Sequence, residues 1–432
     1  MNQEYCCLDT NSLSMKIFKY YFPILILATS FAYPETYELG GMYTQHYRDG
    51  RYAEWGKYSR LGAKIAIETI NKSNMLSGDE ISMLSENIID YHCWTENVDL
   101  MATTLMRKNI IALTGIECSD PAVIIAKLGE SNKIPVVSYG ANAAFLSSTE
   151  RFPWFVRVVA PSESYEKYLI DLAAYFNAKE IAYFYTTDAW GEGSYEVIKE
   201  AASKNKINIL KVYSFPRDEN QSVLDNYIKE VKEKNIKHVV ITTPTPDTVN
   251  IFRSINKFDL NKTGYSFYAA EMILNNESKE VTSGALGYFA PIAKLNDSLH
   301  LRQYSKSFEK IANEKADLKS SNFIYSALSY DHIFLIAHAI RLTKLNKLEV
   351  NRENTLKFLR KVDFNGATGR ISFESDSNDR LNMPIQIMNY QGSKDNGEVV
   401  FESIAEIDQS TGNLNVHENK ILWPGNNKQL LK

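Results

Sequence analysis

The sequence lacks the short motifs that mark common catalytic and nucleotide-binding sites. It has no G-x-G-x-x-G segment after an apolar run, no G-x-x-x-x-G-K-[ST] loop and no H-E-x-x-H pair, which argues against dinucleotide, phosphate-loop and zincin sites. The seven histidines are scattered, and His332 and His338 are six residues apart, the wrong spacing for one helix face. We therefore expect no enzyme activity, no cofactor and no metal site.

The chain also has no long apolar run and no excess of either charge. Its 432 residues include 48 Lys and Arg against 52 Asp and Glu, for a net charge of −4 at pH 7. Without a basic surplus to neutralise phosphates, nucleic acid is not an expected partner. A run of about 18 apolar residues, as in a membrane-spanning helix, is missing. A chain of this length usually forms about two or three domains.

The first 32 residues have the pattern of a secretory signal peptide. Two lysines precede an apolar run at 20–28, and small residues lead to a cleavage site after Ala32. Met15 is an alternative start. A buried strand or helix, or an uncleaved signal anchor in a membrane, is the alternative interpretation. We therefore expect a secreted or periplasmic protein, extracellular if its source is eukaryotic.

Cysteine is scarce, with four in the whole chain. Cys6 and Cys7 lie within the expected signal peptide, so the exported chain would retain Cys93 and Cys118. An even number of cysteines in an exported protein favours one disulfide. Two free buried thiols are the alternative.

Short apolar runs alternate with amphipathic helical patterns along the body of the chain. The runs lie at 110–113, 134–137, 181–185 and 239–241. Helices are expected near 119–131, 190–204 and 246–258. Continuous apolar strands indicate burial on both faces, and strand–helix alternation indicates parallel sheets. Two such series, at 37–159 and 179–270, predict two doubly wound α/β lobes with a ligand site between them.

From about residue 366 the pattern changes to that of a β-hairpin. Extended stretches at 369–373 and 384–390 flank a polar turn at 374–380. The acidic residues of this turn lack the glycine and the distal glutamate of a calcium loop, so a plain turn is the better interpretation.

Several segments, in family order, resemble the type I periplasmic-binding fold. They are 90–93 with 115–119, 134–140, 151–162, 188–191, 369–373 and 421–425. This family includes leucine/isoleucine/valine-binding proteins and the extracellular ligand-binding regions of natriuretic peptide receptors and class C G-protein-coupled receptors. The resemblance extends over nearly all of 37–427. It is closer to the receptor branch, because of the spacing of Cys93 and Cys118 and the late Trp-Pro-Gly.

The resemblance implies two lobes joined by a hinge of three crossovers. Lobe 1 would comprise 36–159 and 290–365, lobe 2 would comprise 160–289 and 366–410, and residues 411–432 would return near the hinge. In the receptor branch lobe 1 forms dimers, so a homodimer or heterodimer through lobe 1 is an expected assembly. A separate membrane transporter or receptor chain would carry the signal.

Five residues are expected to bind the ligand, from their places at strand ends and from the resemblance. Ser119 opens a helix whose N–H groups and dipole favour a carboxylate, and Asn142 follows a strand facing the same crevice. Glu163 and Glu271 would hold an ammonium, and Trp190 would stack on the ligand. The alternatives are an N-cap for Ser119, a turn for Asn142, a helix-dipole role for Glu163, a solvated charge for Glu271 and lobe packing for Trp190.

We therefore expect a non-catalytic, exported protein that closes its lobes around a small amphoteric ligand, an amino acid or derivative, for sensing or uptake. A ligand-free structural or dimer-partner receptor subunit is the alternative, and an α/β enzyme with an unfamiliar site is a further one. Asn142 stands where amino-acid-binding members usually have Ser or Thr, and Glu163 where some have Asp. Because neither Ser119 nor Glu271 is expected to fill the core, alanine at either position should leave stability nearly unchanged.

Overall fold

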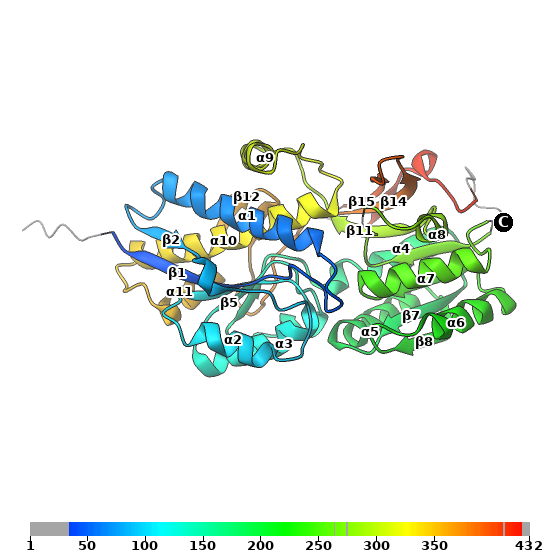
Figure 1. The fold of residues 1–432 in the computed structure, drawn as a ribbon, viewed down its shortest axis with the longest axis horizontal. Coiled ribbons are helices and arrows are strands. Elements are labelled where there is room, and N and C mark those ends of the chain that lie inside the picture. Colours follow the sequence, from blue (N-terminus) through cyan, green and yellow to red (C-terminus); the bar gives the residue numbers. More distant parts are fainter. Residues whose placement is uncertain (1–33, 263, 274, 409–410, 426–432) are drawn as a thin grey trace, which may run out of the picture. The chain divides into compact units, whose positions relative to one another are not determined.

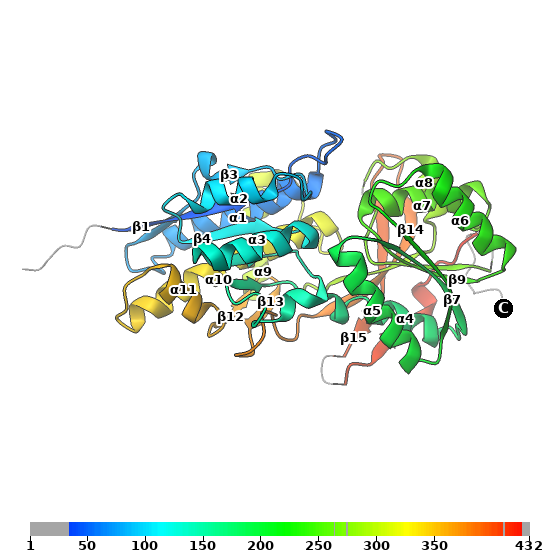
Figure 2. The ribbon, with the colours of Figure 1, turned by 90° about the horizontal axis from the view of Figure 1, so that it is seen from below.

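The structure is a computed structural model that describes residues 34–262, 264–273, 275–408 and 411–425. The expected signal peptide at 1–32 lies outside the described residues. From Glu35 onward the chain forms one compact unit, built from two α/β lobes (Figures 1 and 2).

Lobe 1 is a parallel sheet of six strands covered by helices on both faces. The order is β2-β1-β4-β5-β6, and β3 also pairs with β1. Its strands are β1 (Thr36–Met42), β2 (Glu80–Ser82), β3 (Ile88–Ile89), β4 (Ala112–Ile116), β5 (Val136–Ser138) and β6 (Phe155–Arg157). The helices are α1 (Glu54–Lys72), α2 (Val98–Met106), α3 (Ser119–Asn132), α9 (Leu299–Ala312), α10 (Ser321–Leu345) and α11 (Arg352–Leu359). Figure 1 shows α1 and α10 on one face of the sheet and α2 and α3 on the other.

Lobe 2 has a mixed sheet of eight strands, in the order β16-β15-β14-β11-β10-β9-β7-β8. The strands are β7 (Glu180–Thr186), β8 (Asn208–Phe215), β9 (His238–Thr242), β10 (Ser266–Ala269), β11 (Phe289–Ala293), β14 (Ile385–Ser393), β15 (Val399–Ile407) and β16 (Leu414–Val416). The helices are α4 (Lys167–Tyr175), α5 (Ala189–Lys204), α6 (Gln221–Glu233), α7 (Thr245–Lys257) and α8 (Lys279–Gly284). Strands β7 to β11 are parallel to one another, and β14 to β16 add an antiparallel edge.

The apolar runs seen in the sequence form the centre of each lobe. All of β4 and nearly all of β9 are buried, as expected for strands covered by helices on both faces. α10 is 25 residues long and apolar enough to cross a membrane, but 83% of its most apolar window is buried in the fold. It is therefore the core helix of lobe 1, and it packs along α1.

The lobe boundaries differ from the expected ones at two crossovers. β11 belongs to the lobe 2 sheet through Ala293, so the chain leaves lobe 2 after this strand rather than at 290. The hairpin β12 (Asp363–Gly366) and β13 (Gly369–Ser372) stays with lobe 1. There the N–H groups of Ala367 and Thr368 donate to Asp331 of α10, at 2.7 and 2.8 Å. Lobe 2 therefore resumes at β14 and not at 366.

Strand pairing near the C-terminus also differs from the expectation. The stretch at 369–373 does not form a ladder with the one at 384–390, because β13 pairs with β12, and β14 pairs with β11 and β15. β16 extends the lobe 2 sheet next to β15. Trp423 then packs edge-on against Phe176 and Phe289 of lobe 2. The described part of 411–432 thus covers lobe 2 rather than the hinge.

Candidate functional site

The carboxyl ends of strands from both sheets converge on a cavity of about 150 Å³ between the lobes. Lobe 1 contributes the loops after β1, β4 and β5, and lobe 2 those after β7, β9 and β10. Four of the five expected ligand-binding residues line this cavity: Ser119, Asn142, Trp190 and Glu271. Glu163 is exposed and is not among the described residues that line it.

Ser119 joins two loops of the lobe 1 wall. Its buried hydroxyl accepts hydrogen bonds from the backbone N–H groups of Asn142, at 3.1 Å, and Ala143, at 3.0 Å. The hydroxyl donates a long hydrogen bond to Oδ1 of Asn142, with 3.4 Å between the oxygens. Ser119 therefore holds the loop after β5 against the start of α3, which is a structural role in addition to lining the cavity.

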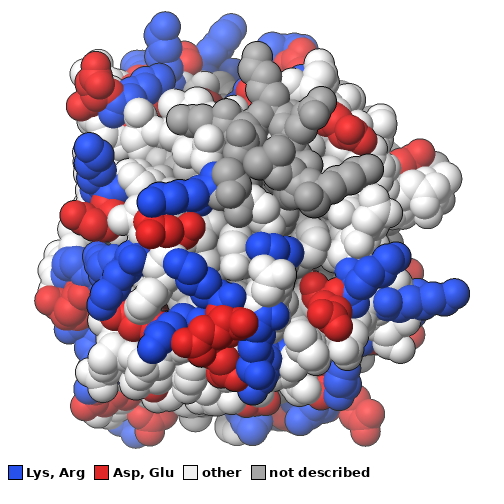
Figure 3. All heavy atoms as spheres, turned by 90° about the vertical axis from the view of Figure 1, so that its right-hand side faces the viewer, with Lys and Arg blue, Asp and Glu red and all other residues white. Residues whose placement is uncertain are grey.

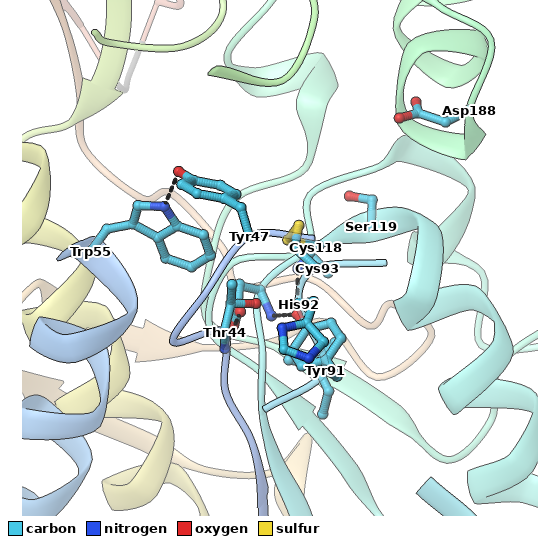
Figure 4. Close-up of a disulfide and its surroundings, with 12 residues drawn as sticks. Thr44, Tyr47, Trp55, Tyr91, His92, Cys93, Cys118, Ser119 and Asp188 are labelled. Carbon is cyan, nitrogen blue, oxygen red and sulfur yellow. Dashed lines mark hydrogen bonds between the residues drawn. A yellow bond between two sulfur atoms is a disulfide. The ribbon is translucent and has the colours of Figure 1, made fainter. Parts of the chain in front are cut away.

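A disulfide links Cys93 and Cys118, the pair expected from the sequence. It joins the loop after β3 to the turn that precedes α3, beside Ser119 (Figure 4). The neighbouring Tyr91 hydroxyl oxygen accepts the N–H groups of Glu117 and Cys118, each at 3.1 Å. Two backbone donors just before α3 are therefore already in use.

Glu117 lines the lobe 1 wall and was not expected from the sequence. Its Oε1 accepts the N–H of Thr44 at 2.8 Å, and its Oε2 accepts the hydroxyl of Tyr139 at 3.0 Å. Burial raises the pKa of the Glu117 carboxyl to about 8. The sequence did contain a signal for this residue, because Glu117 is a charged residue directly after the apolar strand β4. Such positions lie at the edge of a parallel sheet where ligands bind.

Glu166 is the carboxyl that faces the cavity where Glu163 was expected. It is fully buried, and its Oε1 accepts hydrogen bonds from Nε1 of Trp190, at 2.9 Å, and Oγ of Ser194, at 2.8 Å. Its Oε2 has no hydrogen-bond partner among the described residues. Burial raises the pKa of the Glu166 carboxyl to about 8. A 3-10 turn at Ser162–Ser164 precedes α4, and this turn leaves Glu163 outside while Glu166 points in.

Glu271 follows β10 and lines the cavity from the lobe 2 side. It is half-buried, and burial raises the pKa of its carboxyl to about 7, against the effect of a hydrogen bond with Thr245. With Glu166, it places two carboxyl groups on one wall.

Arg217 is the one basic residue among the described residues that line the cavity. Its Nη1 donates to the carbonyl oxygen of Cys93 at 2.9 Å, and its guanidinium lies 4.6 Å from the ring centre of Trp94. Its Nε lies 3.9 Å from Asp188, the N-cap of α5. Arg217 follows β8, so it connects lobe 2 directly to the disulfide loop of lobe 1.

A second, larger cavity of about 710 Å³ is lined by charged side chains that already pair with one another. Its charged side chains include the pairs Lys319–Glu402 and Lys394–Glu398, each at 2.6 Å. The described residues contain no cluster of three or more metal-ligating side chains. The cavity at the strand ends, with an unpartnered buried carboxyl oxygen, is therefore the candidate ligand site.

Known proteins are similar in sequence to most of this chain. The chain is 23% identical over 365 residues to glutamate receptor 3.1 of Oryza sativa subsp. japonica. This alignment covers 76% of this chain and 38% of that protein. It is 21% identical over 378 residues to metabotropic glutamate receptor 4 of Mus musculus. This alignment covers 75% of this chain and 40% of that protein. The chain thus spans about two fifths of the length of these relatives.

A solved structure has a similar fold. It is a solute-binding protein of an ABC transporter from Rhodopseudomonas palustris BisB5, in complex with 3,4-dihydroxybenzoic acid. It superimposes with a TM-score of 0.70 at 18% identity, covering 87% of this chain and 98% of that chain. The family described as "Receptor family ligand binding region" matches residues 59–393. This chain, with two α/β lobes and a cavity at the strand ends, therefore belongs to the receptor family ligand binding region.

Proposed function

We propose that this protein is an exported, non-catalytic binding protein that closes its two lobes around a small molecule with an ammonium group, an amino acid or a derivative of one. The observation that carries this proposal is the cavity lined from both lobes, with the unpartnered carboxyl oxygen of Glu166 beside Glu271. A volume of about 150 Å³ suits a small ligand. Membership in a ligand-binding family of receptors supports binding rather than catalysis.

Lobe closure is the proposed mechanism. A ligand that touches Asn142 of lobe 1 and Glu271 of lobe 2 interacts with both walls only when they are close, so it stabilises the closed arrangement. A separate membrane transporter or receptor chain would then detect the closed state. A homodimer or heterodimer through lobe 1 is part of the same proposal.

A thermal-shift screen of amines and amino acids, followed by calorimetric titration, tests this function. A true ligand at 100 times its dissociation constant adds about 2.7 kcal/mol to the free energy of unfolding. The shift should be lost in Glu271→Ala and retained in Glu163→Gln, which changes an exposed carboxylate outside the cavity. If no compound gives a shift and sedimentation shows a dimer instead, the ligand-free dimer-partner role is the better description.

Export to an oxidising compartment is part of the proposal. A disulfide such as Cys93–Cys118 persists outside the cytosol and is rare inside it. Protein isolated from its natural source and alkylated without reductant should have no modified Cys93 or Cys118 by intact mass. Two alkylated thiols would argue against export.

A further inference from the structure

Carboxyl groups outnumber basic groups among the described residues that line the cavity. Five lining residues carry a carboxyl group and one carries a basic group. The acidic residues are Glu117, Asp120, Glu166, Asp188 and Glu271. The chain as a whole is nearly neutral, with 52 acidic and 48 basic residues. Across the described part of the lobe 2 face in Figure 3, the two signs are interspersed. This excess of carboxyl groups is therefore a property of the cavity.

Arg217 is not free to neutralise a ligand carboxylate. Its guanidinium is bound to the Cys93 carbonyl, lies over Trp94 and is close to Asp188. Its side chain is 13% exposed. Asp188 already offsets part of the Arg217 charge from 3.9 Å, and the bond to Cys93 holds the guanidinium against lobe 1.

Several polar groups near the start of α3 are already in use. The N–H groups of Glu117 and Cys118 donate to Tyr91, and the Ser119 hydroxyl is an acceptor for two backbone groups. Asp120 lies in the first turn of α3, where a carboxylate already offsets the positive end of the helix dipole. A ligand carboxylate here would face Asp120 without a free cation beside it.

The same cavity is well built for a cation. Oε2 of Glu166 is buried without a hydrogen-bond partner among the described residues, and a buried polar atom left unpaired destabilises the protein unless a ligand satisfies it. Aromatic side chains line the same cavity: Tyr47, Trp55, Tyr165, Trp190 and Tyr325. Ring faces attract ammonium groups, and Figure 4 shows Tyr47 and Trp55 side by side, joined by a 2.7 Å hydrogen bond from Trp55 Nε1 to the Tyr47 hydroxyl.

We infer that the cavity prefers an organic cation without a carboxylate, so that an amine binds more tightly than the amino acid from which it derives by loss of the carboxyl group. The ammonium lies against Glu166 and Glu271, and the organic body contacts the aromatic walls. This inference rests on the proposed function, because it names the ligand class of the same cavity.

Protonation provides an independent readout. Burial raises the pKa of Glu166 to about 8 and of Glu271 to about 7, so both lose protons when a cation binds. These two carboxyls interact electrostatically with each other, and Glu163 acts on Glu166. The tyrosines that interact with one or the other are Tyr47, Tyr165, Tyr183, Tyr288 and Tyr325. Amine affinity should therefore rise between pH 6 and pH 8, with proton release to the buffer.

Calorimetric titration of the purified full chain with matched pairs tests the inference. The pairs are phenethylamine with phenylalanine, tyramine with tyrosine, tryptamine with tryptophan, and agmatine with arginine. We expect an amine to bind about ten-fold or more tightly than its parent amino acid. If the parent binds as tightly or more tightly in every pair that binds, the inference fails while the proposed function stands. If neither member of any pair binds, the inference also fails, and the screen described above decides the function separately.

Two isosteric variants test the residues. Glu166→Gln retains an acceptor for Trp190 and Ser194, and Glu271→Gln changes only the charge. Each should weaken amine binding about ten-fold and reduce proton release, with unchanged circular dichroism. The control is Glu196→Gln, which changes an exposed carboxylate of α5 outside the cavity lining and should bind like the wild type. Wild-type affinity in both cavity variants would overturn the inference.

Discussion

Arg157 Nε donates a hydrogen bond to Oδ1 of Asp379 at 2.6 Å, joining two of the three segments that connect the lobes. The Arg157 side chain is fully buried, and its Nη1 also donates to the carbonyl oxygens of Ala141 and Ala143, at 3.0 and 2.9 Å. These carbonyls flank Asn142. One side chain therefore ties the hinge to the lobe 1 wall of the cavity.

Arg157→Ala should lower the free energy of unfolding by about 3–5 kcal/mol, because it leaves Asp379 and two buried carbonyls without their partner. Urea denaturation measures the change. The control is Arg370→Ala, whose 2.6 Å pair with Asp363 is exposed and should contribute no more than about 1 kcal/mol. Equal losses in the two variants would contradict a special role for the buried arginine.

Ser119→Ala should also destabilise the protein, by about 1–3 kcal/mol, because two backbone N–H groups lose their buried acceptor. This outcome differs from the sequence-based expectation of nearly unchanged stability. Ser131→Ala on the same helix is the control, since Ser131 is exposed and donates to the carbonyl of Lys127. Thermal unfolding of both variants gives the comparison, and similar melting temperatures would show that Ser119 does not hold the loop.

Stability without ligand should fall as the pH rises above neutrality. Burial raises the pKa of Glu117 and of Glu166 to about 8, from about 4.3 in an unfolded chain. The folded state thus holds protons that the unfolded state has lost, and stability is lost as pH rises toward the folded pKa. His332, whose pKa burial lowers to about 3, has the opposite effect, but only below about pH 6.5.

Between pH 6.5 and 8.5 the free energy of unfolding should therefore decrease by on the order of 2 kcal/mol for each of these two carboxyls. Glu117→Gln should reduce this decrease, and the exposed Glu196→Gln should not. Urea denaturation at both pH values is the measurement. A stability that does not change over this interval would mean that Glu117 and Glu166 are already ionised in the folded protein.

Arg217→Ala should favour separation of the lobes, because it removes the hydrogen bond to Cys93 and the contact with Trp94. Small-angle X-ray scattering without ligand should give a larger radius of gyration than for the wild type. Arg302→Ala, which removes an exposed arginine of lobe 1, is the control. An unchanged radius of gyration would show that Arg217 does not hold the two lobes together.

The sequence contained most of the fold and much of the site. Apolar runs such as 181–185 became buried parallel strands because period and burial are local properties of the chain. Ser119, Asn142, Trp190 and Glu271 reached one cavity because each follows a strand, and the carboxyl ends of parallel strands share one edge.

Other features could not be inferred from local pattern. Glu163 and Glu166 both follow Pro161. The 3-10 turn at Ser162–Ser164, which contains Glu163, decides which of the two carboxyls is buried. The sequence pattern of strands β12 and β13 does not indicate which lobe they join. The buried carboxyl of Asp331 accepts hydrogen bonds from their connecting turn and so holds them in lobe 1. Long-range partners determine both outcomes.

The sequence by itself therefore determined the α/β class, the cysteine pair and the edge at which ligand-facing residues gather, because these depend on hydrophobic period, composition and chain order. Only the tertiary structure decided the chemistry of the cavity. It paired Arg217 with lobe 1, gave the Ser119 hydroxyl to the backbone and left one oxygen of Glu166 without a partner. The charge available to a ligand depends on which groups already have partners, and those partners come from distant parts of the chain.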